Sequence, residues 1–213
     1  MTEPVTATSP RTEAYGQTSL TLIDRFGTYL SKRAILRRLP RQRLARVLDL
    51  GCGYRAHLLH ALLPHVDSGV GIDVRIAPEV REGEKLSFIE APIEAALPEL
   101  DGERFDLVLL ISVLEHLWDP LAVLEQCQRV LRPGGMLFVN VPTWRGKFFL
   151  EFSAFRLGTS PALEMDDHKM YYDKRDLWPL LIRARFKPSR VRLSYHKFGL
   201  NLFGTAQKAP AET

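Results

Sequence analysis

Two carboxylates and two glycines lie in an order that suits a small ligand containing a ribose. Residues 47–59 read VLDLGCGYRAHLL, so Asp49 lies at the end of an apolar run, just before Gly51 and Gly53. Asp73 ends the next apolar run, at about the twenty-residue spacing at which an acid accepts hydrogen bonds from a ribose diol. Glycines let the backbone approach a ligand closely. These residues predict a ligand site where two strands end.

The loop is also close to the G-x-G-x-x-G pattern, in which glycines and a helix N-terminus hold the pyrophosphate of a dinucleotide. Counting from Gly51, the third glycine position falls on Ala56, after Arg55, so spacing alone does not exclude an NAD(P)-dependent oxidoreductase. Asp49 argues against that class, because a carboxylate beside a pyrophosphate would repel it. An acid at the loop and an acid for the ribose describe a ligand with an ammonium group, a ribose and no phosphate. S-adenosyl-L-methionine is such a ligand.

Alternating strands and helices must position these residues. Apolar runs predict strands over 47–50, 68–74, 86–90, 105–112 and 136–142, and helices over 54–63, around 94–97 and over 119–131. The last of these helices has Asp119 as its N-cap and Pro120 as its first residue, and RPGG closes it. A helix over 174–185 and a closing antiparallel hairpin around Gly199 follow. This order predicts an α/β, doubly wound sheet with its ligand at the carboxyl ends of the strands.

The motifs taken together resemble a known family. VLDLGCG and GIDV are followed by FDLVLLISVLEHLWDP, VLRPGGMLFVNVP and KFGLNLFGTAQ. In this order they closely resemble the class I S-adenosylmethionine-dependent methyltransferases of the small-molecule type, over about residues 45–207. The resemblance implies a Rossmann-like sheet of seven strands in the order 3-2-1-4-5-7-6, with the last strand antiparallel. It also implies S-adenosyl-L-methionine as the cofactor.

The resemblance implies roles for particular residues around the cofactor. Asp49 would orient the methionine end and Asp73 would accept the ribose hydroxyls, whereas Ile111 and Ser112 would border the methionine end. The simpler alternatives are that Asp49 binds the first amides of the next helix and that Asp73 is an ordinary acid at a strand end. The full set of cofactor residues implied in this way is Asp49, Gly51, Cys52, Gly53, Asp73, Val74, Pro92, Ile93, Ile111 and Ser112.

Recognition of the adenine departs from the family pattern. The family often has an acid after the third strand, and Pro92 occupies that place here, between Glu90 and Glu94. Ile93 would contribute its backbone N–H and an apolar contact to the adenine.

Candidate catalytic residues follow the fourth strand. Methyl transfer is an in-line displacement, for which positioning contributes heavily and a general base is needed only for a weakly acidic acceptor. Glu115 and His116 stand at the mouth of the site, and the alternative for His116 is to fix the loop before the next helix. His168, in DDHKMYY, is a second candidate base; its alternative is a surface histidine packed on Tyr171 or Tyr172.

Some acceptor classes are disfavoured by the motifs. The stretch ISVLEH lacks the Asn/Asp-Pro-Pro-aromatic motif of amide and base-nitrogen methylation, and Asn140 to Pro142 is interpreted as a plain strand end. Neither Cys52 nor Cys127 is placed for cytosine C5 chemistry. Their separation gives no metal spacing and fits a reducing cytosol.

An aromatic-rich insertion at about 143–172 is the best sequence clue to the acceptor. Five large aromatic residues in an irregular stretch are expected to be buried in the core, in a dimer interface or in a pocket wall. We favour a lid or pocket wall shared with the N-terminal helix, and hence a small organic acceptor such as a sugar, polyketide, isoprenoid or lipid-linked intermediate. The aromatic residues are Trp144, Phe148, Phe149, Phe152 and Phe155.

Composition sets the remaining expectations. The 213 residues carry a net charge of +4 and are 46% hydrophobic, and they contain neither a secretory signal nor an apolar run long enough to cross a bilayer, so we expect a soluble cytoplasmic protein. No nucleic-acid or membrane motif is evident, although the basic stretch 31–46 is either a solvated helix face or a surface for an anionic partner. A homodimer through the insertion or the N-terminal helix is one interaction considered. The expected organisation is a disordered leader (1–19), a helical segment (20–44, with its helix over 20–38), the methyltransferase domain (45–207) and a tail (208–213).

The favoured function is O-methylation of a small molecule. One alternative is a non-catalytic subunit or scaffold with this fold, supported by Pro92 and Arg55. Another is a methyltransferase acting on RNA or protein through the basic stretch, whose binding should weaken steeply with salt.

Overall fold

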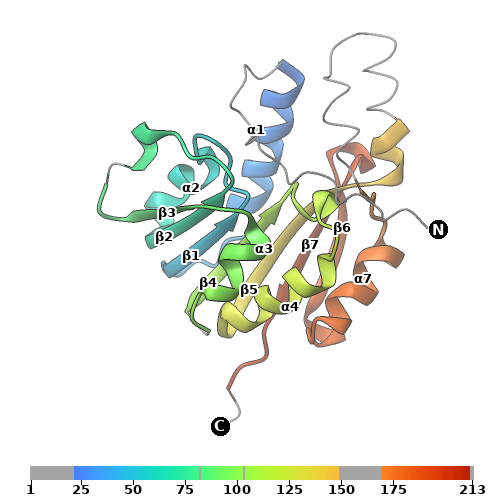
Figure 1. The fold of residues 1–213 in the computed structure, drawn as a ribbon. Coiled ribbons are helices and arrows are strands. Elements are labelled where there is room, and N and C mark those ends of the chain that lie inside the picture. Colours follow the sequence, from blue (N-terminus) through green and yellow to red (C-terminus); the bar gives the residue numbers. More distant parts are fainter. Residues whose placement is uncertain (1–21, 82, 103, 149–168, 212–213) are drawn as a thin grey trace, which may run out of the picture.

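A seven-stranded sheet forms the centre of the protein in a computed structural model, which describes residues 22–81, 83–102, 104–148 and 169–211 (Figure 1). Its strands are β1 (Leu44–Leu50), β2 (Val66–Asp73), β3 (Leu86–Glu90), β4 (Phe105–Ile111), β5 (Leu131–Pro142), β6 (Val191–His196) and β7 (Asn201–Gln207). They run in the order β3-β2-β1-β4-β5-β7-β6. The strands from β3 to β5 are parallel, and β7 is antiparallel to both of its neighbours. The predicted fold class, strand order and antiparallel last strand are confirmed.

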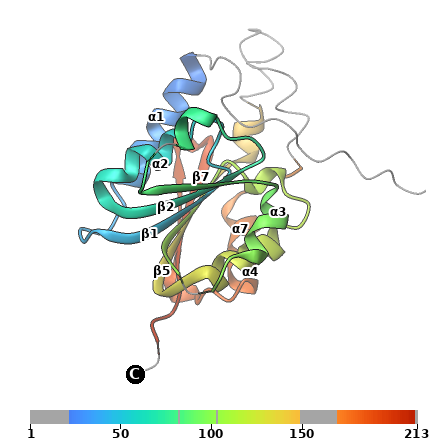
Figure 2. The ribbon, with the colours of Figure 1, turned by 60° about the vertical axis from the view of Figure 1, so that its left-hand side comes forward.

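Helices cover both faces of the sheet (Figures 1 and 2). The α-helices are α1 (Leu22–Leu36), α2 (His57–Leu62), α3 (Ile93–Ala96), α4 (Pro120–Val130) and α7 (Lys174–Arg183). Short 3-10 helices are η1 (Leu63–His65), η2 (Pro78–Arg81), η3 (Leu97–Glu99), η4 (Leu114–His116), η5 (Pro188–Arg190) and η6 (Lys197–Gly199). One face carries α1 and α2, and the other carries α3, α4 and α7 (Figure 2).

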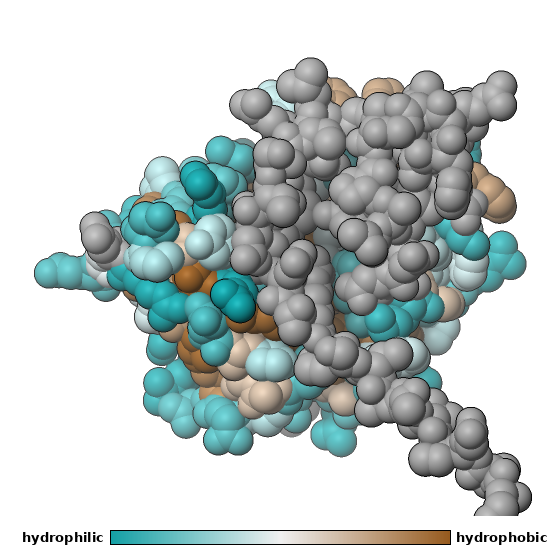
Figure 3. Space-filling model, turned by 45° about the horizontal axis from the view of Figure 1, so that its top comes forward, coloured by the Kyte–Doolittle hydropathy of each residue, from teal (hydrophilic) through white to brown (hydrophobic). Residues whose placement is uncertain are grey.

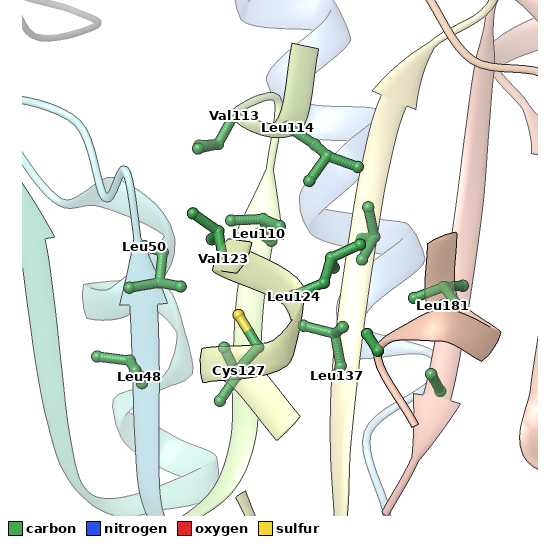
Figure 4. Packing of buried hydrophobic residues seen from close by; sticks show 14 of the residues in the cluster. Leu48, Leu50, Leu110, Val113, Leu114, Val123, Leu124, Cys127, Leu137 and Leu181 are labelled. Atoms are coloured by element: carbon green, nitrogen blue, oxygen red, sulfur yellow. The ribbon is translucent and has the colours of Figure 1, made fainter. Parts of the chain in front are cut away.

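The hydrophobic core lies on both sides of the sheet because the central strands are apolar on both faces. On one side, Val123 and Cys127 of α4, one helical turn apart, pack with the apolar residues of β1, β4 and β5 (Figure 4). On the other side, Ile35 of α1 and Leu59 of α2 belong to a second buried cluster that includes Phe138 of β5. Packing on both faces holds the strands in place, and with them the strand ends that carry the site.

Several element boundaries differ from the prediction by a few residues, and two of these differences change the interpretation of a motif. The helix expected from residue 54 begins at His57, because Ala56 has a left-handed backbone with φ 45°. Arg55 therefore lies in the loop and does not begin the helix. The fifth strand begins at Leu131 rather than at residue 136, so RPGG is part of β5 instead of a helix end. A register shift opposite Phe105 accommodates this start.

The expected N-terminal helix is present as α1, within the described residues. Its buried side chains, Ser31, Ala34 and Ile35, face the sheet, and its exposed ones include Phe26 and Tyr29. In the described part of the chain, no helix has both the length and the apolar character needed to cross a membrane. The surface visible in Figure 3 is largely hydrophilic, with a group of hydrophobic residues beside the grey segments. The expected leader, 1–19, lies outside the described residues.

Candidate cofactor and acceptor site

The predicted site residues gather where the parallel strands end. The carboxyl ends of β1, β4 and β5 lie at the same edge of the sheet, at the top of Figure 1. β1 lies between β2 and β4, the point at which the chain changes direction across the sheet. Open α/β sheets bind ligands at such a switch point.

The glycine loop is held tightly between β2 and the loop after β4. The amides of Gly51 and Cys52 both donate to the carbonyl of Ile72, at 2.8 and 3.2 Å. Gly51 has φ 70°, and a Cβ at this position would lie 2.4 Å from Cγ2 of Val113. Only glycine fits both the backbone angle and this contact. Position 51 therefore has no side chain that could keep a ligand away from the loop backbone.

Asp73 holds the same loop from the end of β2. Its Oδ2 accepts a hydrogen bond from the amide of Gly53 at 2.7 Å, and its Oδ1 accepts one from the amide of Val74 at 2.8 Å. A carboxylate has about four acceptor positions, so one that accepts from two amides can also accept from ribose hydroxyls. From the sequence, we predicted only that Asp73 accepts hydrogen bonds from the ribose hydroxyls. The structure adds the role of fixing the glycine loop against β2.

Asp49 is a buried acid whose oxygen Oδ2 has no hydrogen-bond partner among the described residues. Only 1% of the residue is exposed. Burial, and then the nearby charge of Asp73, raise the pKa of Asp49 from 3.8 to about 8. A buried carboxylate of this kind is stabilised by a cation. Asp49 therefore fits the ammonium group of a methionine moiety and would oppose a phosphate.

The other loop residues have packing roles. The thiol of Cys52 is buried against Gly71, where a Cβ would lie 2.9 Å from Sγ. Burial raises the pKa of this thiol far above its usual value, so it is an unreactive thiol. Ala56, at the third glycine position, adopts the left-handed backbone that glycine would favour, and its amide donates to the carbonyl of Gly53 at 3.1 Å.

The stretch after β3 is organised around backbone contacts. Pro92 is exposed and is the N-cap residue of α3, and Ile93 packs against the core. The amide of Ala91 donates to the carbonyl of Asp73 at 3.0 Å, which ties this stretch to the end of β2. Oε2 of Glu90 accepts from the amide of Ile76 at 3.0 Å and from Arg81 at 2.6 Å. Glu90 thus fixes the β2–β3 loop.

The two candidate catalytic residues after β4 have different environments. Glu115 is 1% exposed, whereas His116 is half-buried. The backbone carbonyl of Glu115 accepts hydrogen bonds from the amides of Lys169 and Met170, at 2.7 and 3.3 Å. The last residues of the aromatic insertion are therefore attached to the loop that carries both candidates.

Tyr172 strengthens this attachment. Its hydroxyl donates to the carbonyl of Leu114 at 3.3 Å, and its amide donates to the carbonyl of Pro142 at 3.0 Å. Burial raises the pKa of Tyr172, so its hydroxyl stays protonated and acts as a donor. His168 and residues 149–168 of the insertion lie outside the described residues. Trp144 and Phe148 are 40% and 68% exposed in the chain alone, so they are not core residues. Their burial in a pocket wall or a dimer interface stays a prediction.

Ile111 and Ser112 stand at the end of β4, as predicted. Ile111 is half-buried, and Ser112 is exposed with a left-handed backbone at φ 57°. The amide of Ser112 donates to the carbonyl of Asn140 on the neighbouring β5 at 2.8 Å. Non-glycine residues with this backbone cluster at functional sites.

Asn140 is the residue that the sequence analysis missed. It is completely buried at the end of β5, and neither Oδ1 nor Nδ2 has a hydrogen-bond partner among the described residues. In β5 it pairs with Ile111 of β4, and it follows Phe138, two residues earlier, which packs on the α1 side. An unpaired buried amide costs about 1–3 kcal/mol. The asparagine within an apolar strand, FVNVP, was the available signal.

Replacing Asn140 by Leu is expected to separate stability from activity. The apolar side chain keeps the branching at Cγ and removes two unpaired polar atoms, which offsets the cost of fitting its larger volume, so the free energy of unfolding should stay within about 1 kcal/mol of the native value. Methyl transfer should fall by about tenfold or more if the amide binds substrate or cofactor. Chemical denaturation and initial-rate assays measure the two effects. A variant as active as the native protein would mean that Asn140 has no ligand.

The doubly wound sheet, the glycine loop and the acids after β1 and β2 define a domain that binds a nucleoside cofactor with a cationic group. A family model described as a methyltransferase domain matches residues 23–187. The chain belongs to this family, the class I S-adenosylmethionine-dependent methyltransferases, as predicted from its motifs. The cofactor predicted from the sequence is the cofactor of the family.

Individual relatives match about half of the chain. A ubiquinone biosynthesis O-methyltransferase of Pseudomonas aeruginosa (strain LESB58) is 31% identical over 112 residues, which cover 49% of this chain and 47% of that protein. The protein of the same name from Xylella fastidiosa (strain 9a5c) is 35% identical over 120 residues, which cover 53% and 45%. The match thus spans less than half the length of these curated relatives.

Solved structures of similar fold cover more of the chain. The 1,6-didemethyltoxoflavin-N1-methyltransferase of Burkholderia thailandensis, with bound 1,6-didemethyltoxoflavin and S-adenosylhomocysteine, has a TM-score of 0.60 and 22% identity. The match covers 84% of this chain and 77% of that one. At this identity the likeness supports the fold.

Proposed function

We propose that this protein transfers the methyl group of S-adenosyl-L-methionine to a hydroxyl of a small organic acceptor, and that a phenol carrying an apolar chain is the favoured acceptor. The observation that carries the methyl-donor half is the buried Asp49, whose Oδ2 has no hydrogen-bond partner among the described residues, next to a glycine loop that Asp73 holds. In this proposal Asp49 binds the amino group, Asp73 binds the ribose hydroxyls, and the backbone at Gly51 and Gly53 lies against the cofactor. The bound cofactor supplies an electrophilic methyl group on a sulfonium.

Two observations favour oxygen as the methylated atom. The relatives that match half of the chain are named O-methyltransferases, and their names concern ubiquinone biosynthesis. A buried acid, Glu115, lies just after β4, close to the expected position of the methyl group. Exposed aromatic side chains on the loops at this edge, including Trp118 and Phe148, suit the apolar part of such an acceptor.

A labelled-methyl assay tests the proposal. The native protein is incubated with S-adenosyl-L-methionine labelled in its methyl group and with an isoprenyl-substituted catechol, its fully O-methylated analogue, a sugar alcohol, or bulk transfer RNA. We expect label in the catechol and none in the analogue, which has no free hydroxyl. Label only in the RNA, weakening steeply with salt, would support the macromolecular alternative. Binding of S-adenosylhomocysteine without transfer to any acceptor would support the non-catalytic alternative.

A further inference from the structure

We propose that Lys197 is the general base that takes the proton of the acceptor hydroxyl. The inference rests on the proposed function, because only an acceptor that carries a proton needs a base. Lys197 belongs to η6, the tight connection between β6 and β7. It is the first residue of the motif KFGLNLFGTAQ, to which the sequence analysis gave no catalytic role.

The connection between β6 and β7 brings Lys197 to the edge of the sheet where the acceptor must bind. β7 begins at Asn201, which pairs with Pro142 at the carboxyl end of β5. The preceding turn is fixed to the chain just after β5: Oγ1 of Thr143 donates to the carbonyl of Gly199 at 2.7 Å, and its amide donates to that of Leu200 at 3.0 Å. The turn therefore lies beside the loops that follow β4 and β5.

The backbone of the turn is strained. Lys197, Phe198 and Gly199 have φ angles of 49°, 58° and 84°, so three successive residues are left-handed and two of them carry a Cβ. L-residues avoid this conformation, and such strain concentrates at functional sites. Phe198 is 89% exposed, so its own side chain gains little from packing within the chain. Lys197, by contrast, is partly buried, with its Nζ 3.6 Å from the position of a Cβ on Gly27 of α1.

The amine stands among charged groups from every element around it. The carboxylate of Glu115, from η4, acts on Lys197 and tends to keep it protonated. The basic neighbours are His196 on β6, which also feels Arg38 from the end of α1, and Arg145, whose Nη1 lies 3.5 Å from a Cβ position on Gly199. Burial outweighs the effect of Glu115 and lowers the pKa of Lys197 from 10.5 to about 8. Near neutral pH, a substantial fraction of the amine is thus unprotonated.

An unprotonated amine at this place is suited to deprotonate a phenol, whose pKa is about 10. The acceptor oxygen forms a bond to the methyl carbon as the carbon–sulfur bond breaks, and the electron pair of that bond stays on sulfur as a neutral thioether. The acceptor proton passes to Nζ of Lys197, and the lysine then returns this proton to water. Glu115, on the other side, stabilises the ammonium group so formed.

The test compares Lys197→Met and Lys197→Arg with Lys187→Met, a control at an exposed lysine before η5. Competitive acetylation over a range of pH, followed by mass spectrometry, measures the pKa of each amine without any acceptor. We expect a pKa near 8 for Lys197, well below the ordinary lysine value of 10.5. With the isoprenyl-substituted catechol, kcat/KM of the native enzyme should rise with pH to a plateau above about 8. Both Lys197 variants should be about 100- to 1000-fold slower, with affinity for S-adenosylhomocysteine within twofold of native.

The outcomes separate this inference from the proposed function. If the native protein methylates no hydroxyl acceptor, the proposed function fails before any variant is compared, and the base proposal fails with it. If the native protein is active, the inference alone is overturned by an ordinary pKa for Lys197 or by native rates in Lys197→Met. It is also overturned if Lys197→Arg restores the rate, because a permanently charged guanidinium supplies charge but accepts no proton.

Discussion

Replacing Asp73 by Ala is expected to weaken binding of S-adenosylhomocysteine at least about 100-fold. Two hydroxyl hydrogen bonds to a carboxylate contribute about 1.5–3 kcal/mol each. The substitution also removes the acceptors of the Gly53 and Val74 amides, so the glycine loop keeps only the bonds of its Gly51 and Cys52 amides to Ile72 of β2. Isothermal titration calorimetry measures the loss of affinity.

Asp67→Ala is the matched control for this prediction. Asp67 lies at the other end of the same strand, is exposed and pairs with Arg43 on the surface. Because surface ion pairs contribute little, this variant should bind as the native protein does. Equal affinities for Asp73→Ala and Asp67→Ala, with both variants folded by circular dichroism, would remove Asp73 from the cofactor site.

Replacing Asp49 by Asn is expected to lower the affinity about 10- to 100-fold and to abolish its pH dependence. The amino group of the ligand favours the ionised carboxylate, so binding below pH 8 should release the proton that the raised pKa retains on Asp49. In the native protein, affinity should therefore rise by up to about tenfold per pH unit between pH 6 and pH 8 and then level off. The substitution leaves Asn140 and Lys197 in place, so we expect the acceptor side of the site to stay folded as in the native protein.

The same substitution should lower the affinity for the ligand but raise the stability of the ligand-free protein. The pKa of Asp49 is higher in the ligand-free folded protein than in the unfolded chain, so its contribution to stability is complete below about pH 4 and is lost as the pH rises towards 8. Without ligand, Asp49→Asn should unfold at a higher temperature than the native protein at pH 8, and the difference should shrink at pH 5. A native affinity that is independent of pH, or an unstable Asp49→Asn variant at pH 8, would contradict the account.

The fold was predictable because its signals are local. Short apolar runs predicted the strands. The Asp119–Pro120 pair predicted the start of α4, where Oδ1 of Asp119 accepts from the amide of Ala122 at 3.0 Å. The early start of β5 depends on a tertiary contact, because Leu131 pairs with Phe105 of β4. The late start of α2 follows from the left-handed backbone of Ala56, which periodicity does not reveal.

Only those site residues could be predicted whose type and spacing form a recognisable motif. Asp49, Gly51 and Asp73 stand in a fixed order, so spacing and residue type sufficed to group them. Asn140 and Lys197 lie within the motifs VLRPGGMLFVNVP and KFGLNLFGTAQ, but the motifs gave them no role. Burial and backbone strain distinguish them, and periodicity reveals neither. The second role of Asp73, in holding the Gly53 amide, likewise required the geometry of the loop.

One titration tests the central claim, that this loop binds the methionine-linked nucleoside of a methyl donor. The native protein is titrated calorimetrically with S-adenosylhomocysteine and, separately, with NAD at pH 8. The account predicts a single site for S-adenosylhomocysteine and no heat from NAD, because the buried carboxylate of Asp49 attracts an ammonium group and repels a pyrophosphate. Binding of NAD alone, or of neither ligand, would contradict it.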